Sequence, residues 1–251
     1  MLRIFVTWTI SVILATTVAA TGGAAEAVID WSDWDGILAR NVVNGVVDYD
    51  GIAAEAGFAT TVEAIAEADL SEADDLAVLA FSINTYNVLA VQGILNGRSP
   101  RTAFGKLKYF MTDKYVIASE KLSLYAFEHK KIIPLGEPRI HFAIVCASAS
   151  CPILRSEAYV PARLETQLDE AAREFINDPT KNSFDLEGGT ARISKIFKWF
   201  RDEFEAAGGS LAGYLARWVD DPELQDALEQ GRIKIKHQPY DWSLNGTFSR
   251  R

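Results

Sequence analysis

Four of the five cysteine and histidine side chains in this chain fall within one short stretch. Cys146, Cys151, His129 and His141 lie between positions 129 and 151, whereas His237 is remote in sequence. A thiolate is a strong nucleophile, and a nearby histidine can take the thiol proton. The cluster therefore predicts a cysteine-based catalytic site that attacks a carbonyl carbon.

The order of residues favours Cys151 as the nucleophile. Cys151-Pro152 has the form of a helix start, where the helix dipole and free backbone N–H groups stabilise a thiolate and can cradle an oxyanion. Cys146 is the second candidate. The candidate bases are His141 and His129.

A third group normally orients the base in such a site. Glu128, next to His129, offers a carboxylate, and Asn87 and Asn84 offer amides. The amides have a competing structural interpretation, because buried amides also fix loops by hydrogen bonding. His237 is expected to be structural.

Three other interpretations of the two cysteines stay open. They can form a disulfide, which in a loop this short gives little entropic stabilisation. With His129 and His141 they offer the ligand types of a zinc site, although the spacing matches no usual zinc pattern. They can also be buried free thiols or a redox pair, for which the C-x4-C spacing is unlike the usual C-x-x-C.

The elements that must position these residues are mostly helical. Residues 76–95 form an apolar helix, opened by a capping-box-like Ser71 to Asp74, that should be buried at the core. Residues 140–145 are predicted to form a strand that Cys146 follows directly. The side chains of His141 and Cys146 are then expected on opposite faces. Further helices are expected over 124–133, 164–175 and 194–204, and strands over 114–118, 191–193 and 233–237. The predicted fold is α+β: a single helix-rich domain with a small, mostly antiparallel sheet packed on a buried central helix.

The N-terminus resembles a secretory signal peptide. A positive start ending at Arg3 precedes an uncharged apolar run, and small residues then offer cleavage after Ala20, Ala25 or Ala27. We therefore expect a signal peptide over 1–27, one domain over 28–251, and a periplasmic or secreted location. Export to an oxidising compartment favours disulfide formation.

Composition excludes several classes of protein. Of the 251 residues, 49% are hydrophobic and 24% charged, which excludes a disordered or fibrous chain. The net charge of −9 gives no reason to bind nucleic acid, and we expect no stable membrane association after signal cleavage. Because no glycine-rich phosphate loop, dinucleotide fingerprint or G-x-S-x-G elbow is present, no cofactor is expected. The sequence leaves the oligomeric state open.

Five blocks of sequence, in order between about 47 and 245, resemble domain-of-unknown-function family 547 (DUF547). They are Phe81-Ser-Ile-Asn-Thr-Tyr-Asn87, Leu122-Ser-Leu with Glu128-His129, Pro138-Arg-Ile-His-Phe-Ala-Ile-Val-Cys146, Ser150-Cys151-Pro152 and Tyr240-Asp-Trp-Ser-Leu-Asn245. One departure is Ser82, where the family has tryptophan. The resemblance implies an exported bacterial domain of unsettled activity, with a distant relation to papain-like and transglutaminase-like cysteine hydrolases.

Two functions follow as hypotheses. The first is a thiol-dependent hydrolase or acyltransferase acting on amide or ester bonds of periplasmic peptides or proteins. The second is a non-catalytic binding or scaffold module whose Cys146–Cys151 disulfide makes a ligand-facing loop rigid.

Overall fold

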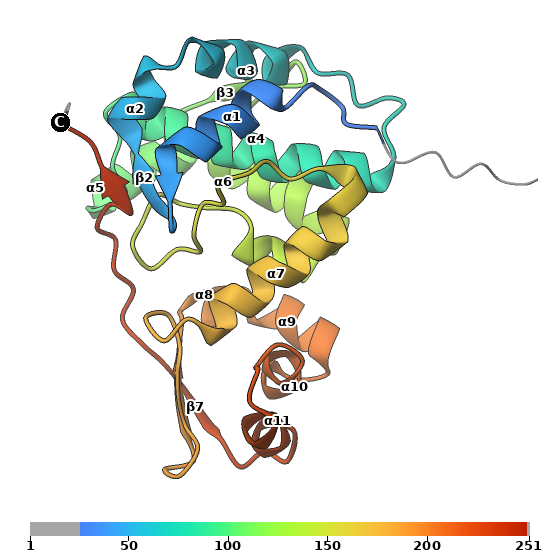
Figure 1. Ribbon diagram of the computed structural model, residues 1–251, viewed down its shortest axis with the longest axis vertical. Helices are drawn as coiled ribbons and strands as arrows, with labels where there is room; N and C mark the ends of the chain where they lie inside the picture. The colour runs from blue at the N-terminus through green and yellow to red at the C-terminus, as the bar shows by residue number, and fades with distance from the viewer. Residues whose placement is uncertain (1–25, 250–251) are drawn as a thin grey trace, which may run out of the picture.

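The computed structural model describes residues 26–249, and the expected signal peptide lies almost entirely outside them (Figure 1). The α-helices are α1 (Ser32–Asn41), α2 (Tyr49–Ala54), α3 (Ala56–Glu67), α4 (Asp75–Leu95), α5 (Ala103–Lys106), α6 (Leu124–Phe127), α7 (Leu164–Asn177), α8 (Ile196–Trp199), α9 (Arg201–Gly208), α10 (Leu211–Ala216) and α11 (Pro222–Glu229). The π-helical segments η1 (Leu107–Thr112) and η2 (Glu128–Ile132) continue α5 and α6, and 3-10 turns occur at η3 (Ile133–Leu135), η4 (Pro138–Phe142) and η5 (Pro161–Arg163).

The strands are short and form three small sheets within the described residues. They are β1 (Val42–Val43), β2 (Val46–Asp48), β3 (Tyr115–Ile117), β4 (Glu120–Leu122), β5 (Ser183–Asp185), β6 (Thr190–Ile193), β7 (Lys234–His237) and β8 (Gly246–Thr247). The sheet orders are β1-β2-β8, β3-β4 and β5-β6-β7. The three hairpin pairs β1–β2, β3–β4 and β5–β6 are antiparallel, whereas β2–β8 and β6–β7 are parallel. The α+β, helix-rich class is confirmed, with the strands divided among peripheral sheets.

Helix α4 is the buried central helix that the sequence predicts. Asp74 caps it, with a side-chain oxygen that accepts from the Ala77 N–H at 2.8 Å, and Gly97 follows its end with a left-handed φ of 75°. Ser71 lies in the preceding turn, so the predicted cap is wrong by three residues. Among residues 26–249, α4 is the one helix long and apolar enough to cross a membrane, and it is buried within the protein.

Two hydrophobic cores meet in the middle of the molecule. The first surrounds α4 in the upper half of Figure 1, and the second lies among α8 to α11 and β6 in the lower half. Helix α7 contributes to both, with Leu164 and Leu168 in the first core and Phe175 and Ile176 in the second. The segment 140–145 is divided in the same way, because Phe142 packs in the second core and Val145 in the first.

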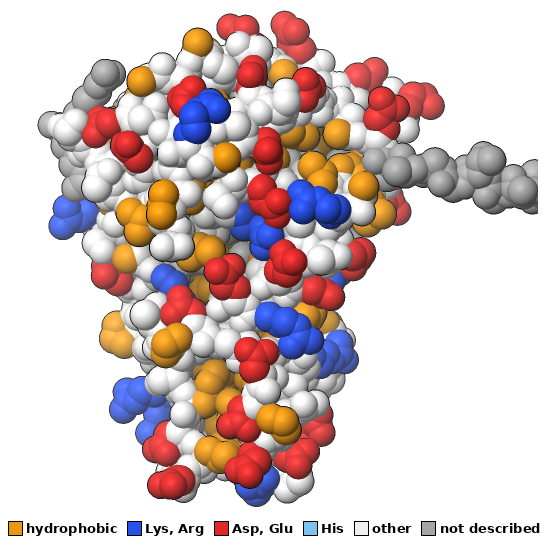
Figure 2. Space-filling model, in the orientation of Figure 1, with side chains coloured by type: hydrophobic (Ala, Val, Ile, Leu, Met, Phe, Trp, Pro, Cys, Tyr) orange, Lys and Arg blue, Asp and Glu red, His pale blue; other side chains and the backbone are white. Residues whose placement is uncertain are grey.

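Most predicted elements are present near their predicted positions. These include α7, β3, β6 and β7, and Ser123 caps α6 through its bond from the Ala126 N–H. The expected helix over 194–204 is interrupted at Phe200, between α8 and α9. The acidic surface agrees with the net charge: Figure 2 shows acidic side chains over much of this face, including the end near α11.

Candidate active site

A cavity of about 150 Å³ brings together four of the residues that the sequence predicts for catalysis. Its walls include Cys146, Cys151, His141 and Glu128. The rest of its lining is largely aromatic: Tyr86, Phe110, Trp199, Phe200, Tyr240 and Trp242. Tyr86 and Phe110 pack with the first core, whereas the other four aromatic residues come from chain beyond residue 190. The cavity therefore lies between the part of the molecule around α4 and the part around α8 to α11.

The two cysteines are joined by a disulfide. Cys146 is partly exposed and Cys151 is buried. The Cys146 Sγ lies 3.0 Å from Ser148 Oγ and 3.3 Å from Tyr240 Oη. Because a disulfide sulfur carries no hydrogen, these hydroxyl groups are the donors. The backbone N–H of Cys146 points at Cys151 Sγ, 2.8 Å away.

The predicted helix start at Cys151 is wrong, since residues 152–155 have no regular structure. The loop from 147 to 150 is instead held by the C-terminal segment. The Ala149 N–H donates to the Ser243 carbonyl at 2.7 Å, and the Asn245 N–H donates to the Ala147 carbonyl at 3.2 Å. The loop conformation therefore depends on residues almost a hundred positions away, and a helix dipole at Cys151 plays no part.

The predicted strand over 140–145 is also wrong. Pro138 is the first residue of the 3-10 turn η4. The backbone after this turn forms hydrogen bonds with a side chain and not with a neighbouring strand. Asn87 of α4 donates to the Ala143 carbonyl at 3.0 Å and accepts from the Val145 N–H at 2.8 Å. The expectation that His141 and Cys146 face opposite ways fails with the strand, because both line the same cavity.

His141 is buried between a carboxylate and an aromatic ring. Its Nε2 lies 2.9 Å from Glu203 Oε2, and its ring stacks on Phe200 with 3.7 Å between ring centroids. Burial lowers the pKa of His141, an effect that the hydrogen bond and charge of Glu203 oppose. In the neutral ring the Nε2–H donates to Glu203, which leaves Nδ1 as an unprotonated acceptor. That Nδ1 is buried and has no hydrogen-bond partner in the described structure.

Sequence reasoning missed Glu203, which lies on α9. The only local signal is a run of charged residues, Arg201-Asp202-Glu203, which is typical of a solvated helix surface. Its carboxylate is 62 positions from His141 in sequence, and only the packing of α9 against η4 brings the two together.

Glu128 is the second ionisable group of the cavity wall. Burial raises its pKa to about 7, although the hydrogen bond from Tyr86 opposes the shift. The Tyr86 O–H donates to Glu128 Oε2 at 3.3 Å. A carboxyl group that titrates near neutral pH can exchange protons with a bound molecule.

The other predicted residues lie outside the cavity wall. His129 is partnered with Tyr125: the rings stack with centroids 3.8 Å apart, and His129 Nδ1 lies 3.1 Å from the Tyr125 carbonyl. The expected pairing of His129 with Glu128 is absent, because one is exposed and the other buried. His237 contacts the Ser194 carbonyl at 3.4 Å.

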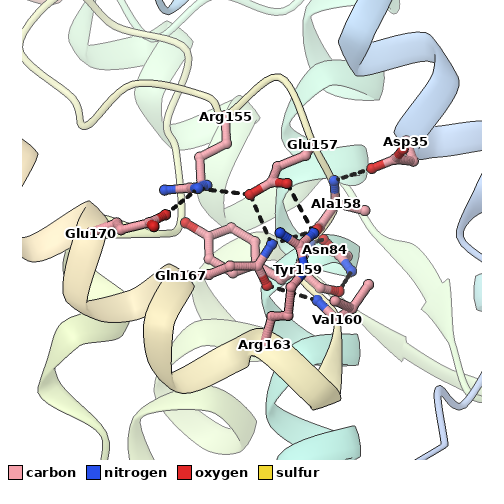
Figure 3. A network of polar contacts seen from close by, with 10 residues as sticks. All are labelled: Asp35, Asn84, Arg155, Glu157, Ala158, Tyr159, Val160, Arg163, Gln167 and Glu170. Atoms are coloured by element: carbon pink, nitrogen blue, oxygen red, sulfur yellow. Dashed lines mark hydrogen bonds and ion pairs between the residues drawn. The ribbon is translucent and has the colours of Figure 1, made fainter.

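Asn84 fixes the chain that follows Cys151 (Figure 3). It donates to the Tyr159 carbonyl at 2.7 Å and accepts from the Tyr159 N–H at 2.9 Å. Gln167 of α7 holds the neighbouring residues, and Arg155 pairs with Glu157 at 2.7 Å. Asn84 and Asn87 thus hold the backbone on either side of the cysteine loop by hydrogen bonds. This agrees with the structural interpretation of these amides, in which they fix loops and do not orient a histidine.

The described residues contain no group of three or more His, Cys, Asp or Glu side chains that could hold a metal ion. The four ligands of the zinc interpretation are not gathered, because the two sulfurs are bonded to each other and His129 turns to Tyr125.

The cavity thus brings the cysteine pair together with His141, which is bound to Glu203, within an α+β fold. Comparison with known families assigns the chain further: residues 70–176 match the model described as "Protein of unknown function, DUF547". The resemblance to this family predicted from sequence is confirmed over residues 70–176. The matched segment includes α4, η4, both cysteines and all of α7 except its last residue, but not Glu203 or Tyr240. No curated protein and no solved structure matches the chain.

Proposed function

We propose that the protein is a thiol-dependent hydrolase or acyltransferase acting on amide or ester bonds of peptides or proteins outside the cytoplasm. The observation that carries the proposal is the cavity that the cysteine pair shares with His141. The unpartnered Nδ1 of this histidine can accept a proton, while its Nε2 is held by Glu203. The signal-peptide pattern of residues 1–27 supports the location.

Cys146 is the better nucleophile of the pair. It is the more exposed of the two residues, and the hydroxyl groups of Ser148 and Tyr240 lie within hydrogen-bonding distance of its sulfur. Two hydroxyl donors stabilise a thiolate. The argument for Cys151 rested on a helix start that is absent, and Cys151 becomes the residue that blocks Cys146 in the disulfide.

The reaction begins from the reduced pair. A dithiol reductant breaks the disulfide by exchange and is itself oxidised to a disulfide. His141 Nδ1 then takes the Cys146 proton, and Glu203 stabilises the imidazolium through Nε2. The thiolate attacks the carbonyl carbon to form a C–S bond, and His141 returns the proton to the departing amine or alcohol as its bond breaks.

The acyl-enzyme is released by a second attack. Water gives hydrolysis, and an amine or alcohol gives acyl transfer, with the Cys146 thiol restored in either case. The aromatic walls, including Trp199 and Trp242, favour a substrate that presents an apolar or planar group beside its carbonyl.

The test is hydrolysis of a p-nitrophenyl ester by residues 28–251 with and without a dithiol reductant. The wild type should be active only after reduction. Cys151→Ser should be active without reductant, and Cys146→Ser should be inactive in both conditions. His141→Gln should lower the rate by about 10² to 10⁴, whereas the matched control His237→Gln should not.

Thiol alkylation followed by mass spectrometry provides an independent readout. Iodoacetamide should label Cys146 faster than Cys151 in the reduced protein, and His141→Gln should slow that labelling near neutral pH. Equal hydrolysis by wild type and Cys146→Ser would overturn the proposal.

The disulfide itself favours a second candidate function, a non-catalytic binding module. The Cys146–Cys151 bond and the backbone hydrogen bonds that the loop makes with residues 243 and 245 hold the loop beside the aromatic cavity. A double Cys146→Ser, Cys151→Ser variant that folds and keeps full biological activity would favour binding over catalysis.

A further inference from the structure

A second surface of the molecule carries exposed apolar side chains on a helix. Segments α5 and η1 together run from 103 to 112, and they expose Phe104 by 65%, Leu107 by 45% and Met111 by 48%. Their spacing of three and four residues places them on one helix face. The opposite face carries the buried Tyr109. Such a contiguous apolar face on a soluble protein marks an interaction site.

The same segment has a charge opposite to that of the whole chain. Residues 98–114 contain five basic residues and one acidic residue, Asp113, in a chain of net charge −9. Asp113 is already paired with Arg98. Arg101 and Lys114 are exposed, and the Lys108 ammonium lies 4.7 Å from the ring of Phe104. The apolar side chains are therefore flanked by cations, which is the pattern of an interfacial helix.

We propose that this face binds the surface of an anionic phospholipid bilayer, with Phe104, Leu107 and Met111 at the acyl boundary and Arg101, Lys108 and Lys114 against the headgroups. This revises the expectation from the net charge, because the charge is unevenly distributed over the molecule. A symmetric contact between two copies through the same face would bring these cations together, so charge complementarity favours an anionic lipid surface over a second copy.

Membrane binding through this face would place the cavity close to lipid. Phe110, in the same helical segment, lines the cavity together with Trp242, and the Lys106 ammonium lies 3.7 Å from the Trp242 ring. Substrate attached to, or dissolved in, the membrane surface would then be available to the cavity. The inference stands apart from the proposed chemistry, because it requires no reactive cysteine.

The test is co-sedimentation of residues 28–251 with vesicles of mixed phosphatidylglycerol and phosphatidylcholine, compared with phosphatidylcholine alone. Binding should require the anionic lipid and weaken with added salt. The double variant Arg101→Glu, Lys108→Glu should bind about 30-fold more weakly. The control is the double variant Arg232→Glu, Lys234→Glu, at and just before the start of β7. It changes the net charge by the same amount and should bind as the wild type does.

The apolar contribution has its own matched pair. The double variant Phe104→Ser, Leu107→Ser should weaken binding by about tenfold or more. Leu76 is 37% exposed near the N-terminal end of α4, far along that helix from α5, and Leu76→Ser should not weaken binding. Cys146→Ser should bind vesicles normally even if it abolishes hydrolysis, so the two proposals fail separately. Absence of vesicle binding, equal loss in the control variants, or dimerisation through Phe104 without lipid binding would each overturn the inference.

Discussion

Replacing Glu128 by glutamine should make the protein more stable than the wild type above neutral pH. Burial raises the pKa of Glu128 from 4.5 to about 7. A carboxyl group with a higher pKa in the folded chain binds its proton more tightly there, so stability is lost as pH rises from about 4.5 to 7. The shift corresponds to about 3 kcal/mol of unfolding free energy at pH 8 or above.

Glutamine is neutral at every pH and keeps an oxygen that can accept from Tyr86. Urea unfolding at about pH 5 and about pH 8 should show a loss for the wild type that exceeds the loss for Glu128→Gln by about 2.5 kcal/mol. The matched control Glu63→Gln, an exposed position on α3, should leave the wild-type pH dependence unchanged. If the unfolding free energy of Glu128→Gln has the same pH dependence as that of the wild type, the reasoning that burial raises the pKa of Glu128 is refuted.

Three further changes test the elements that hold the site. Asn87→Ala should lower the unfolding free energy by about 3 kcal/mol, because two buried backbone groups lose their partner, and denaturant unfolding would measure it. Reducing the Cys146–Cys151 bond should cost only about 2 kcal/mol and lower Tm by about 4 to 8 °C in calorimetry, because the closed loop is short; unfolding on reduction would contradict this. Asp74→Ala should cost about 1 kcal/mol through loss of the α4 cap, and an unchanged urea midpoint would argue against that bond.

Sequence patterns predicted the elements whose formation depends on local composition. The apolar run 76–95 is too long for a strand. It is also apolar on nearly every face of a helix, which a surface helix is not, so a buried helix α4 was predictable. The run 140–145 is equally apolar, but a short apolar run does not distinguish a strand from irregular buried backbone. What decided its conformation was Asn87, 56 and 58 positions away, whose amide takes the place of a neighbouring strand.

The candidate site was predictable in part for the same reason. The scarcity of cysteine and histidine directed attention to Cys146, Cys151 and His141, which do line one cavity. Their relation to Glu203 and Tyr240 depends on how the second core packs, and no spacing in the sequence encodes it. The resemblance to DUF547 is confirmed over residues 70–176, and this match ends before Glu203 of α9, which binds His141.

The hydrogen bonds between the cysteine loop and residues 241–245 have a consequence for the order of folding. The cysteine loop takes its conformation from residues that are synthesised after it, and β8 then pairs with β2, near the beginning of the described residues. Contacts of such long sequence separation form late. A chain synthesised only as far as residue 240 would therefore hold its cysteines in an unassembled loop, and the cavity would close only after residues 241–247 are added.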